Sequence, residues 1–94
     1  MRLIILPSKQ FKRQYRRLQV SGNVRLIHKL DAMIEALACG EKLPESARSH
    51  KLLGNLNKYV ECHVEPDWLL IYQVYEENLI LELFATGTHA TLFG

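Results

Sequence analysis

Cysteine is scarce in this sequence: Cys39 and Cys62 are the only two in 94 residues. They form no CxxC pair and have no histidine at zinc-finger intervals, so their spacing predicts no metal site. We expect both to be buried free thiols.

Long hydrophobic runs are also lacking. The one early apolar run, residues 3–6, is far shorter than the roughly 20 residues that cross a membrane. Its flanks do not fit a secretory leader either. We therefore expect a cytoplasmic protein with no membrane partner. The length and the 48% hydrophobic content predict one compact domain, residues 1–94, with a single core.

Acidic residues are missing from the first third of the chain. Residues 1–30 hold eight basic residues and no acid, whereas residues 31–94 hold all ten acids and four bases. The early bases are Arg2, Lys9, Lys12, Arg13, Arg16, Arg17, Arg25 and Lys29. This polarity suggests a polyanion or an acidic partner on one side of the domain. Ordinary solvated helix charge is the alternative, and composition alone does not separate the two.

The first half of the chain has a strand and helix pattern. Residues 1–6 predict a short strand, and Ser8 is a candidate helix cap. In residues 9–20, Phe11, Tyr15 and Leu18 recur at helical spacing, and the bases from Lys9 to Arg17 fall on the opposite face. Residues 24–38 predict a second helix, and the two should form a hairpin. Residues 40–57 are polar and rich in turn residues, which predicts a loop with room for a short strand near its end.

Strand patterns dominate the second half. Residues 58–64, 68–75 and 78–84 predict three consecutive antiparallel strands joined by tight turns. Val60, Cys62 and Val64 alternate with Tyr59, Glu61 and His63. The first group should face the core and the second should face away from it.

Four residues that can carry chemistry should meet at one edge of this meander. The first strand ends there, the second begins there, and the third ends there. The residues gathered are His63, Asp67, Trp68 and His89.

Histidines and a carboxylate can form an acid/base set, because histidine titrates near neutral pH. The sequence offers no glycine-rich phosphate loop, so the simplest supported reaction uses a nucleophile carried by the substrate. The 2′-hydroxyl of RNA is such a nucleophile, and its attack on the adjacent phosphate needs no cofactor. Trp68 and Phe93 could stack on unpaired bases.

Each of these residues also has a plainer interpretation. A single strand histidine is more often a surface residue, and Asp67 after a proline can simply cap a turn. Trp68 and Phe93 are more often core residues than platforms for bases. His28 has no acidic or histidine companion nearby in the sequence, and we interpret it as structural.

Three motifs together resemble one protein family. His50, CHVEPDWLLIY at 62–72 and TGTHATLFG at 86–94 resemble the YafQ-type branch of the RelE-like toxins of bacterial type II toxin-antitoxin systems. The resemblance implies an α+β, RelE-like fold: an N-terminal strand, a two-helix hairpin, then an antiparallel meander with the helices packed on one face. It implies a ribosome-dependent mRNA endonuclease that needs no metal or cofactor and is held inactive by a cognate antitoxin. DNA would be a partner only through the antitoxin complex.

The resemblance also implies roles for site residues. His50, His63, Asp67 and His89 would be catalytic, with His89 as general acid and His50 as general base. Asp67 and His63 would orient the nucleotide or share the base role. The substrate-binding residues would be Trp68, Phe93, Lys51 and Lys58. The basic first helix would contact ribosomal RNA and the antitoxin.

Two positions depart from the family pattern. Ala85 stands where the family usually has an arginine that grips the scissile phosphate, and Val60 also stands where relatives often have arginine. Loss of one positively charged group that stabilises the transition state typically lowers the rate about a hundred- to a thousandfold. The nuclease activity of this chain is therefore expected to be weakened. Either the alanine was introduced deliberately, or the chain diverged and Lys51 or Lys58 supplies the charge. The alternative is a catalytically inactive member that binds RNA or antitoxin.

Overall fold

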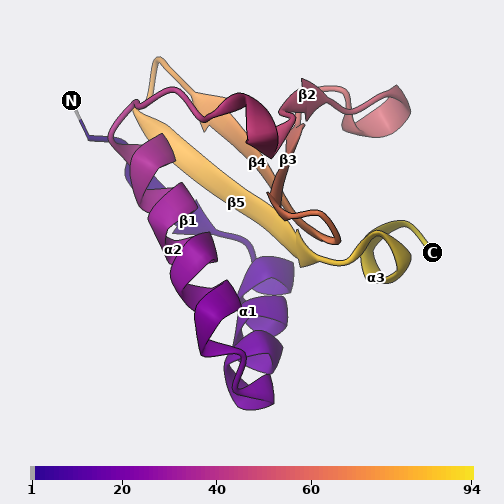
Figure 1. Ribbon diagram of the computed structural model, residues 1–94. Helices are drawn as coiled ribbons and strands as arrows, with labels where there is room; N and C mark the ends of the chain where they lie inside the picture. The colour runs from indigo at the N-terminus through magenta and orange to yellow at the C-terminus, as the bar shows by residue number, and fades with distance from the viewer. Residues whose placement is uncertain (1) are drawn as a thin grey trace.

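The computed structural model describes residues 2–94 as a five-stranded sheet with two helices on one face (Figure 1). The N-terminal half contains β1 (Ile4–Pro7), α1 (Lys9–Ser21) and α2 (Val24–Ala38). The C-terminal half contains β2 (His50–Lys51), β3 (Val60–Glu65), β4 (Trp68–Tyr75), β5 (Ile80–Gly87) and α3 (His89–Phe93). Short 3₁₀ turns lie at Glu45–Ala47 and Gly54–Leu56. None of the helices within residues 2–94 has the length and apolar character needed to cross a membrane.

The sheet order is β1-β5-β4-β3-β2. The strands β2 to β5 pair antiparallel in sequence order, which confirms the predicted meander. The strand β1 pairs parallel with β5, because the helical hairpin carries the chain away from the sheet before the meander begins (Figure 1). The expected strand at residues 1–6 is shifted to Ile4–Pro7, and Met1 lies outside the described residues.

Both helices begin at a capping side chain, and α1 ends at a glycine. The Ser8 hydroxyl accepts from the Phe11 amide at 3.0 Å, and Asn23 Oδ1 accepts from the Leu26 amide at 3.2 Å. Gly22 ends α1 with a φ of 76°, a conformation that glycine adopts without a steric penalty. The helix predicted at 24–38 is confirmed, and the one predicted at 9–20 extends by one residue.

The core lies between the helices and one face of the sheet. Phe11 and Leu18 from α1 and Leu30 from α2 pack against Cys62 and Leu70 from the sheet. Val60 and Val64 pack against the same core, as strand alternation predicts. The prediction that both cysteines are buried was wrong for Cys39, which is exposed because it lies at the end of α2, beyond the core.

Two elements differ from the sequence-based expectation. The strand β5 continues to Gly87, because its last residues still pair with the start of β4. The helix α3 was not predicted. It forms because the Thr88 hydroxyl accepts from the Thr91 amide at 3.1 Å, and the Thr91 hydroxyl accepts from the Thr88 amide at 2.9 Å.

Candidate active site

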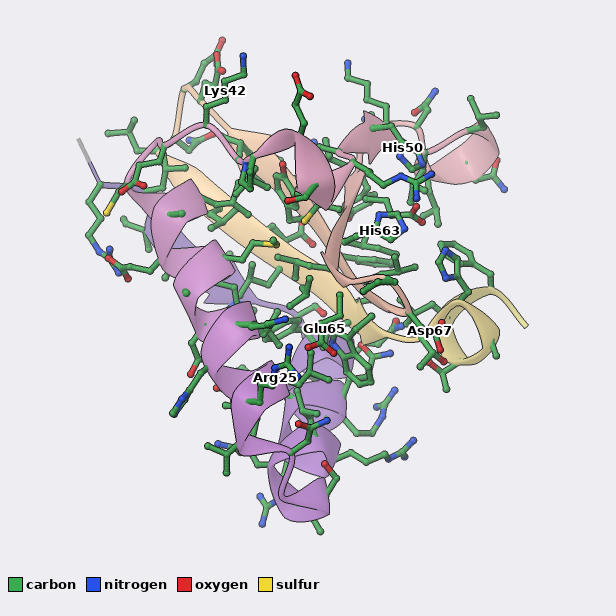
Figure 2. The ribbon with its side chains drawn as sticks, viewed as in Figure 1. Arg25, Lys42, His50, His63, Glu65 and Asp67 are labelled. Carbon is green, nitrogen blue, oxygen red and sulfur yellow. The ribbon has the colours of Figure 1, made fainter. Side chains whose placement is uncertain are left out.

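The sheet register places the predicted site on the face away from the helices. His50 pairs with Glu61, and Glu61 pairs with Ile71. His63 pairs with Leu69, two residue pairs nearer the β3–β4 turn. Because Cys62 faces the helical core, its neighbours Glu61 and His63 face the other way. Figure 2 shows His50, His63 and Asp67 along the side of the molecule between β2 and α3.

His63, Asp67 and His89 are brought together. The His63 and His89 rings have centroids 5.6 Å apart. His89 Nδ1 lies 3.7 Å from Asp67 Oδ1. The gathering of these three residues at one sheet edge therefore agrees with the meander argument. The His89 and Asp67 side chains are 51% and 80% exposed, so a macromolecular substrate can reach them.

His50 joins this group through Glu61. His50 Nε2 lies 3.2 Å from Glu61 Oε2, and His50 Nδ1 lies 3.0 Å from the carbonyl oxygen of Arg48. Both ring nitrogens of His50 therefore face acceptors. The sequence pattern of the loop could not place His50. In the structure, the two residue pairs between β2 and β3 place it beside Glu61.

Sequence reasoning missed Glu61. Its side chain is only 8% exposed and lies among the site histidines. Strand alternation predicts that Glu61 lies on the same face as His63. A carboxylate on that face of a predicted strand was the signal that could have identified it. Buried carboxylates are uncommon unless they are paired, and His50 is the pairing residue here.

Glu61, His63 and His89 form a group that could hold a cation. One ligand atom from each lies within 4.8 Å of the others. In residues 2–94, His63 Nδ1 is the buried side-chain nitrogen that has no hydrogen-bond partner. Two imidazoles and one carboxylate with an open position suit Zn²⁺. The expectation of no metal site came from cysteine spacing, which does not bear on these three residues.

The predicted substrate-binding residues lie in different environments. Trp68 is partly buried against the core, and its Nε1 donates to Thr86 Oγ1 at 2.8 Å. Phe93 is 49% exposed on α3, so it is not a core residue. Lys51 and Lys58 are exposed. Lys51 follows His50 within β2, so alternation directs the two side chains to opposite faces.

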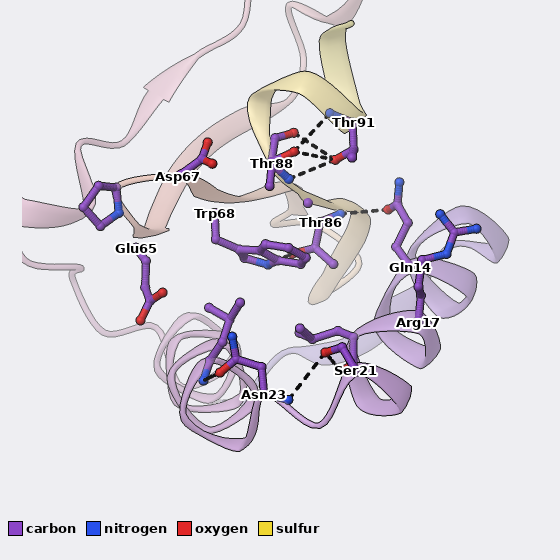
Figure 3. Close-up of a pocket in the computed structure, with 14 residues that line it drawn as sticks. Gln14, Arg17, Ser21, Asn23, Glu65, Asp67, Trp68, Thr86, Thr88 and Thr91 are labelled. Carbon is purple, nitrogen blue, oxygen red and sulfur yellow. Dashed lines mark hydrogen bonds between the residues drawn. The ribbon is translucent and has the colours of Figure 1, made fainter.

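A cavity of about 710 Å³ lies beside the site, around Trp68 (Figure 3). The C-terminal part of α1 and the start of α2 form one wall, and the β3–β4 turn, the start of β4 and the end of β5 form the other. Asp67 and Thr88 belong to both the cavity and the edge that holds His89. The cavity therefore opens next to the group formed by His63, Asp67 and His89.

Ala85 lies in the same cross-strand row as the His50–Glu61 pair. It pairs with Ile71, which pairs with Glu61, and it is 1% exposed. A longer side chain at position 85 would extend over the face that holds Glu61. Val60 packs against the core, which is a sufficient reason for an apolar residue there.

The helix α1 carries the predicted basic stripe. Five of its basic side chains are exposed, and Phe11 and Leu18 on the other side are buried. The exposed residues are Lys9, Lys12, Arg13, Arg16 and Arg17.

Comparisons with known proteins agree with these features. The family model described as "Bacterial toxin of type II toxin-antitoxin system, YafQ" matches residues 3–94. An mRNA interferase toxin YafQ from Escherichia coli strain K12 is 48% identical over 52 residues, which cover 55% of this chain and 54% of that protein. The chain thus spans about half the length of the first curated relatives it matches.

Solved structures match over nearly the whole chain. The toxin in the E. coli DinJ–YafQ toxin-antitoxin complex aligns over all of both chains, with a TM-score of 0.87 and 33% identity. A metal-bound toxin from Helicobacter pylori aligns over 97% of this chain and 99% of its own, with a TM-score of 0.82 and 34% identity. The expected RelE-like α+β class is confirmed.

Proposed function

Because this chain belongs to the YafQ family of bacterial type II toxins, we propose that it is an mRNA endonuclease that acts on the ribosome. A cognate antitoxin would neutralise it. The observation that carries the proposal is the convergence of His63, Asp67 and His89 at one exposed edge of the sheet. The neighbouring His50–Glu61 pair extends this group across β2 and β3.

The proposed reaction is transesterification within the RNA. A base removes the proton of a ribose 2′-hydroxyl, the oxygen attacks the adjacent phosphate, and an acid protonates the departing 5′-oxygen. We assign the acid role to His89, whose Nδ1 faces Asp67 Oδ1. The carboxylate orients the ring so that the other nitrogen faces substrate.

We assign the base role to His50, with His63 sharing it. His50 Nδ1 can donate to the Arg48 carbonyl, and Nε2 then takes the proton once the ribose hydroxyl has replaced Glu61 Oε2 beside it. Glu61 beside Nε2 stabilises the imidazolium that forms. No step in this scheme requires a metal or cofactor.

The basic stripe on α1 is the proposed contact with ribosomal RNA. Lysine and arginine bind phosphates without regard to sequence, and counterion release makes such binding depend on salt. The same surface has the charge to attract an acidic segment of an antitoxin.

A second candidate is a member of the family that binds RNA or antitoxin without cleaving. Ala85 favours it, because an arginine at this position would supply positive charge to the transition state. Loss of one such group typically costs about a hundred- to a thousandfold in rate. A weakened nuclease is therefore the form of the proposal that we put to the test.

The test uses ribosomes programmed with a short message. The wild-type chain should cut the message, and His89→Gln should not. His28→Gln, a change at an exposed position on α2, should cut like wild type and controls for the loss of an imidazole. Equal cleavage by wild type and His89→Gln would remove His89 from the mechanism. Cleavage by none of the three would favour the second candidate.

A further inference from the structure

The cavity around Trp68 has no role in the acid/base scheme, although it opens beside it. Its volume of about 710 Å³ falls within the range of roughly 300–1,000 Å³ that is typical of small-molecule sites. Leu18 and Leu26 provide apolar lining, and Trp68 contributes an aromatic surface (Figure 3). Such a surface suits a flat ring with polar edges.

Two carboxamides fix the polarity of this cavity. The Oε1 atom of Gln14 accepts from the Thr86 amide at 2.9 Å. The Oδ1 atom of Asn23 accepts from the Leu26 amide at 3.2 Å. Because both oxygens are used by the backbone, each side chain has its NH₂ group left to donate. Neither NH₂ group has a hydrogen-bond acceptor within residues 2–94.

Arg17 strengthens this bias toward donors, and Glu65 does not oppose it. Arg17 lines the cavity and forms no ion pair within the part of the chain that the structure describes. Glu65 also lines it, but its carboxylate is 3.0 Å from Lys29 Nζ and so already has a cationic partner. The groups that Gln14, Arg17 and Asn23 leave free for a ligand are therefore donors, and the Asp67 carboxylate is an acceptor at the edge shared with His89.

We propose that this cavity binds one nucleobase of the RNA substrate and selects a base with a carbonyl oxygen at pyrimidine position 4 or purine position 6, that is, uracil or guanine. Uracil and guanine present acceptor oxygens, whereas the corresponding positions of cytosine and adenine carry amino groups. An amino group facing the half-buried Gln14 NH₂ group or the exposed Asn23 NH₂ group would give these donors no acceptor on the base. The inference rests on the proposed function, because it takes RNA as the substrate.

The position of the cavity indicates which nucleotide it holds. Asp67 lines the cavity and lies 3.7 Å from His89, so the base belongs to a nucleotide next to the scissile phosphate. Arg17 on the rim can contact the phosphate of the same nucleotide. The Trp68 cavity would thereby contribute to the sequence preference of cleavage.

A binding experiment without ribosomes tests the inference. Trp68 is the only tryptophan, so tryptophan fluorescence reports on this cavity alone. Uridine and cytidine are uncharged, similar in size and opposite in polarity at position 4. Both should change the fluorescence, and uridine should bind about threefold to tenfold more tightly, the equivalent of one net hydrogen bond. The side-chain NH₂ resonances of Gln14 and Asn23 should shift with uridine.

Two nearly isosteric variants test the donors. Gln14→Glu and Asn23→Asp keep the oxygen that caps the backbone and replace the NH₂ group with an acceptor. Each should abolish the preference for uridine or reverse it toward cytidine. Gln19→Glu adds the same charge at an exposed position on α1 outside the Trp68 cavity, and it should keep the preference. Thermal melting checks that each variant is folded.

Three results would overturn the inference. One is no change in fluorescence or NH₂ resonances with either nucleoside at its solubility limit. Another is equal affinity of the wild-type chain for both nucleosides, which would mean that a base stacks on Trp68 but that its polar edge is not recognised. The third is protection of the cavity by purified antitoxin while nucleosides have no effect, which would assign it to the protein partner. Failure of mRNA cleavage would overturn the proposed nuclease and leave these titrations unaffected.

Discussion

His50 Nε2 and Glu61 Oε2 lie 3.2 Å apart and join β2 to β3. The strand β2 has only two residues and two residue pairs with β3, so its backbone gives limited support to His50. The Glu61 side chain is 8% exposed and fixed by its strand. The Glu61 side chain, held by the longer strand, therefore helps to position His50.

Glu61→Gln should lower the cleavage rate more than it weakens substrate binding. The amide cannot stabilise an imidazolium as a carboxylate does. We expect a loss of about tenfold to a hundredfold, within the roughly 10²- to 10⁴-fold that general acid/base catalysis provides. Single-turnover cleavage on ribosomes measures it. Glu61→Asp should recover part of the rate. Wild-type rates in Glu61→Gln would limit Glu61 to a structural role.

Ala85→Arg should raise the cleavage rate. Position 85 shares a cross-strand row with Ile71 and Glu61, so the guanidinium would extend over the face that holds Glu61 and the proposed acid/base residues. A new positive charge that stabilises the transition state is expected to raise the cleavage rate about a hundredfold or more. Ala85 is 1% exposed, so a melting curve must accompany each rate. Ala85→Gln provides length without charge, and equal rates for the two variants would contradict the electrostatic explanation.

The sequence predicted the regular elements well, because their signals are local. Ser8 caps the helix that starts at Lys9, and alternation in β3 separates Cys62 from Glu61 and His63. The position of His50 depends on a two-residue pairing between distant segments, for which the polar loop carries no periodic pattern. Nor could local signals tell that β1 pairs with β5, since that contact joins the two ends of the chain.

Zn²⁺ should inhibit cleavage, and a chelator should restore it. The ligand atoms of Glu61, His63 and His89 lie within 4.8 Å of one another. An ion bound there would occupy the lone pairs that proton transfer requires. Mg²⁺ should have no such effect, because it prefers oxygen ligands in octahedral geometry. Calorimetric titration of the untagged chain checks binding separately, and unchanged zinc affinity in His63→Gln would place the ion elsewhere.

The two cysteines should differ in reactivity. Burial, with a smaller contribution from the charge of Glu61, raises the pKa of Cys62 to about 12. At pH 8 its thiol is therefore protonated as well as inaccessible, whereas Cys39 is exposed. A thiol reagent should modify one cysteine quickly in the folded chain and both after unfolding. Rapid modification of Cys39→Ser would contradict the burial of Cys62.

The same raised pKa of Cys62 predicts how alkali affects stability. The unfolded thiol ionises near its ordinary pKa of 9.0, whereas the folded one keeps its proton to about pH 12. The contribution of Cys62 to stability is therefore fully present below pH 9 and is lost as the pH rises through the folded value. The loss approaches about 1.4 kcal/mol per pH unit within that window. Urea unfolding between pH 7 and pH 10 should show a shallower decline for Cys62→Ala than for wild type. Parallel declines would mean that the folded thiol ionises as readily as the unfolded one.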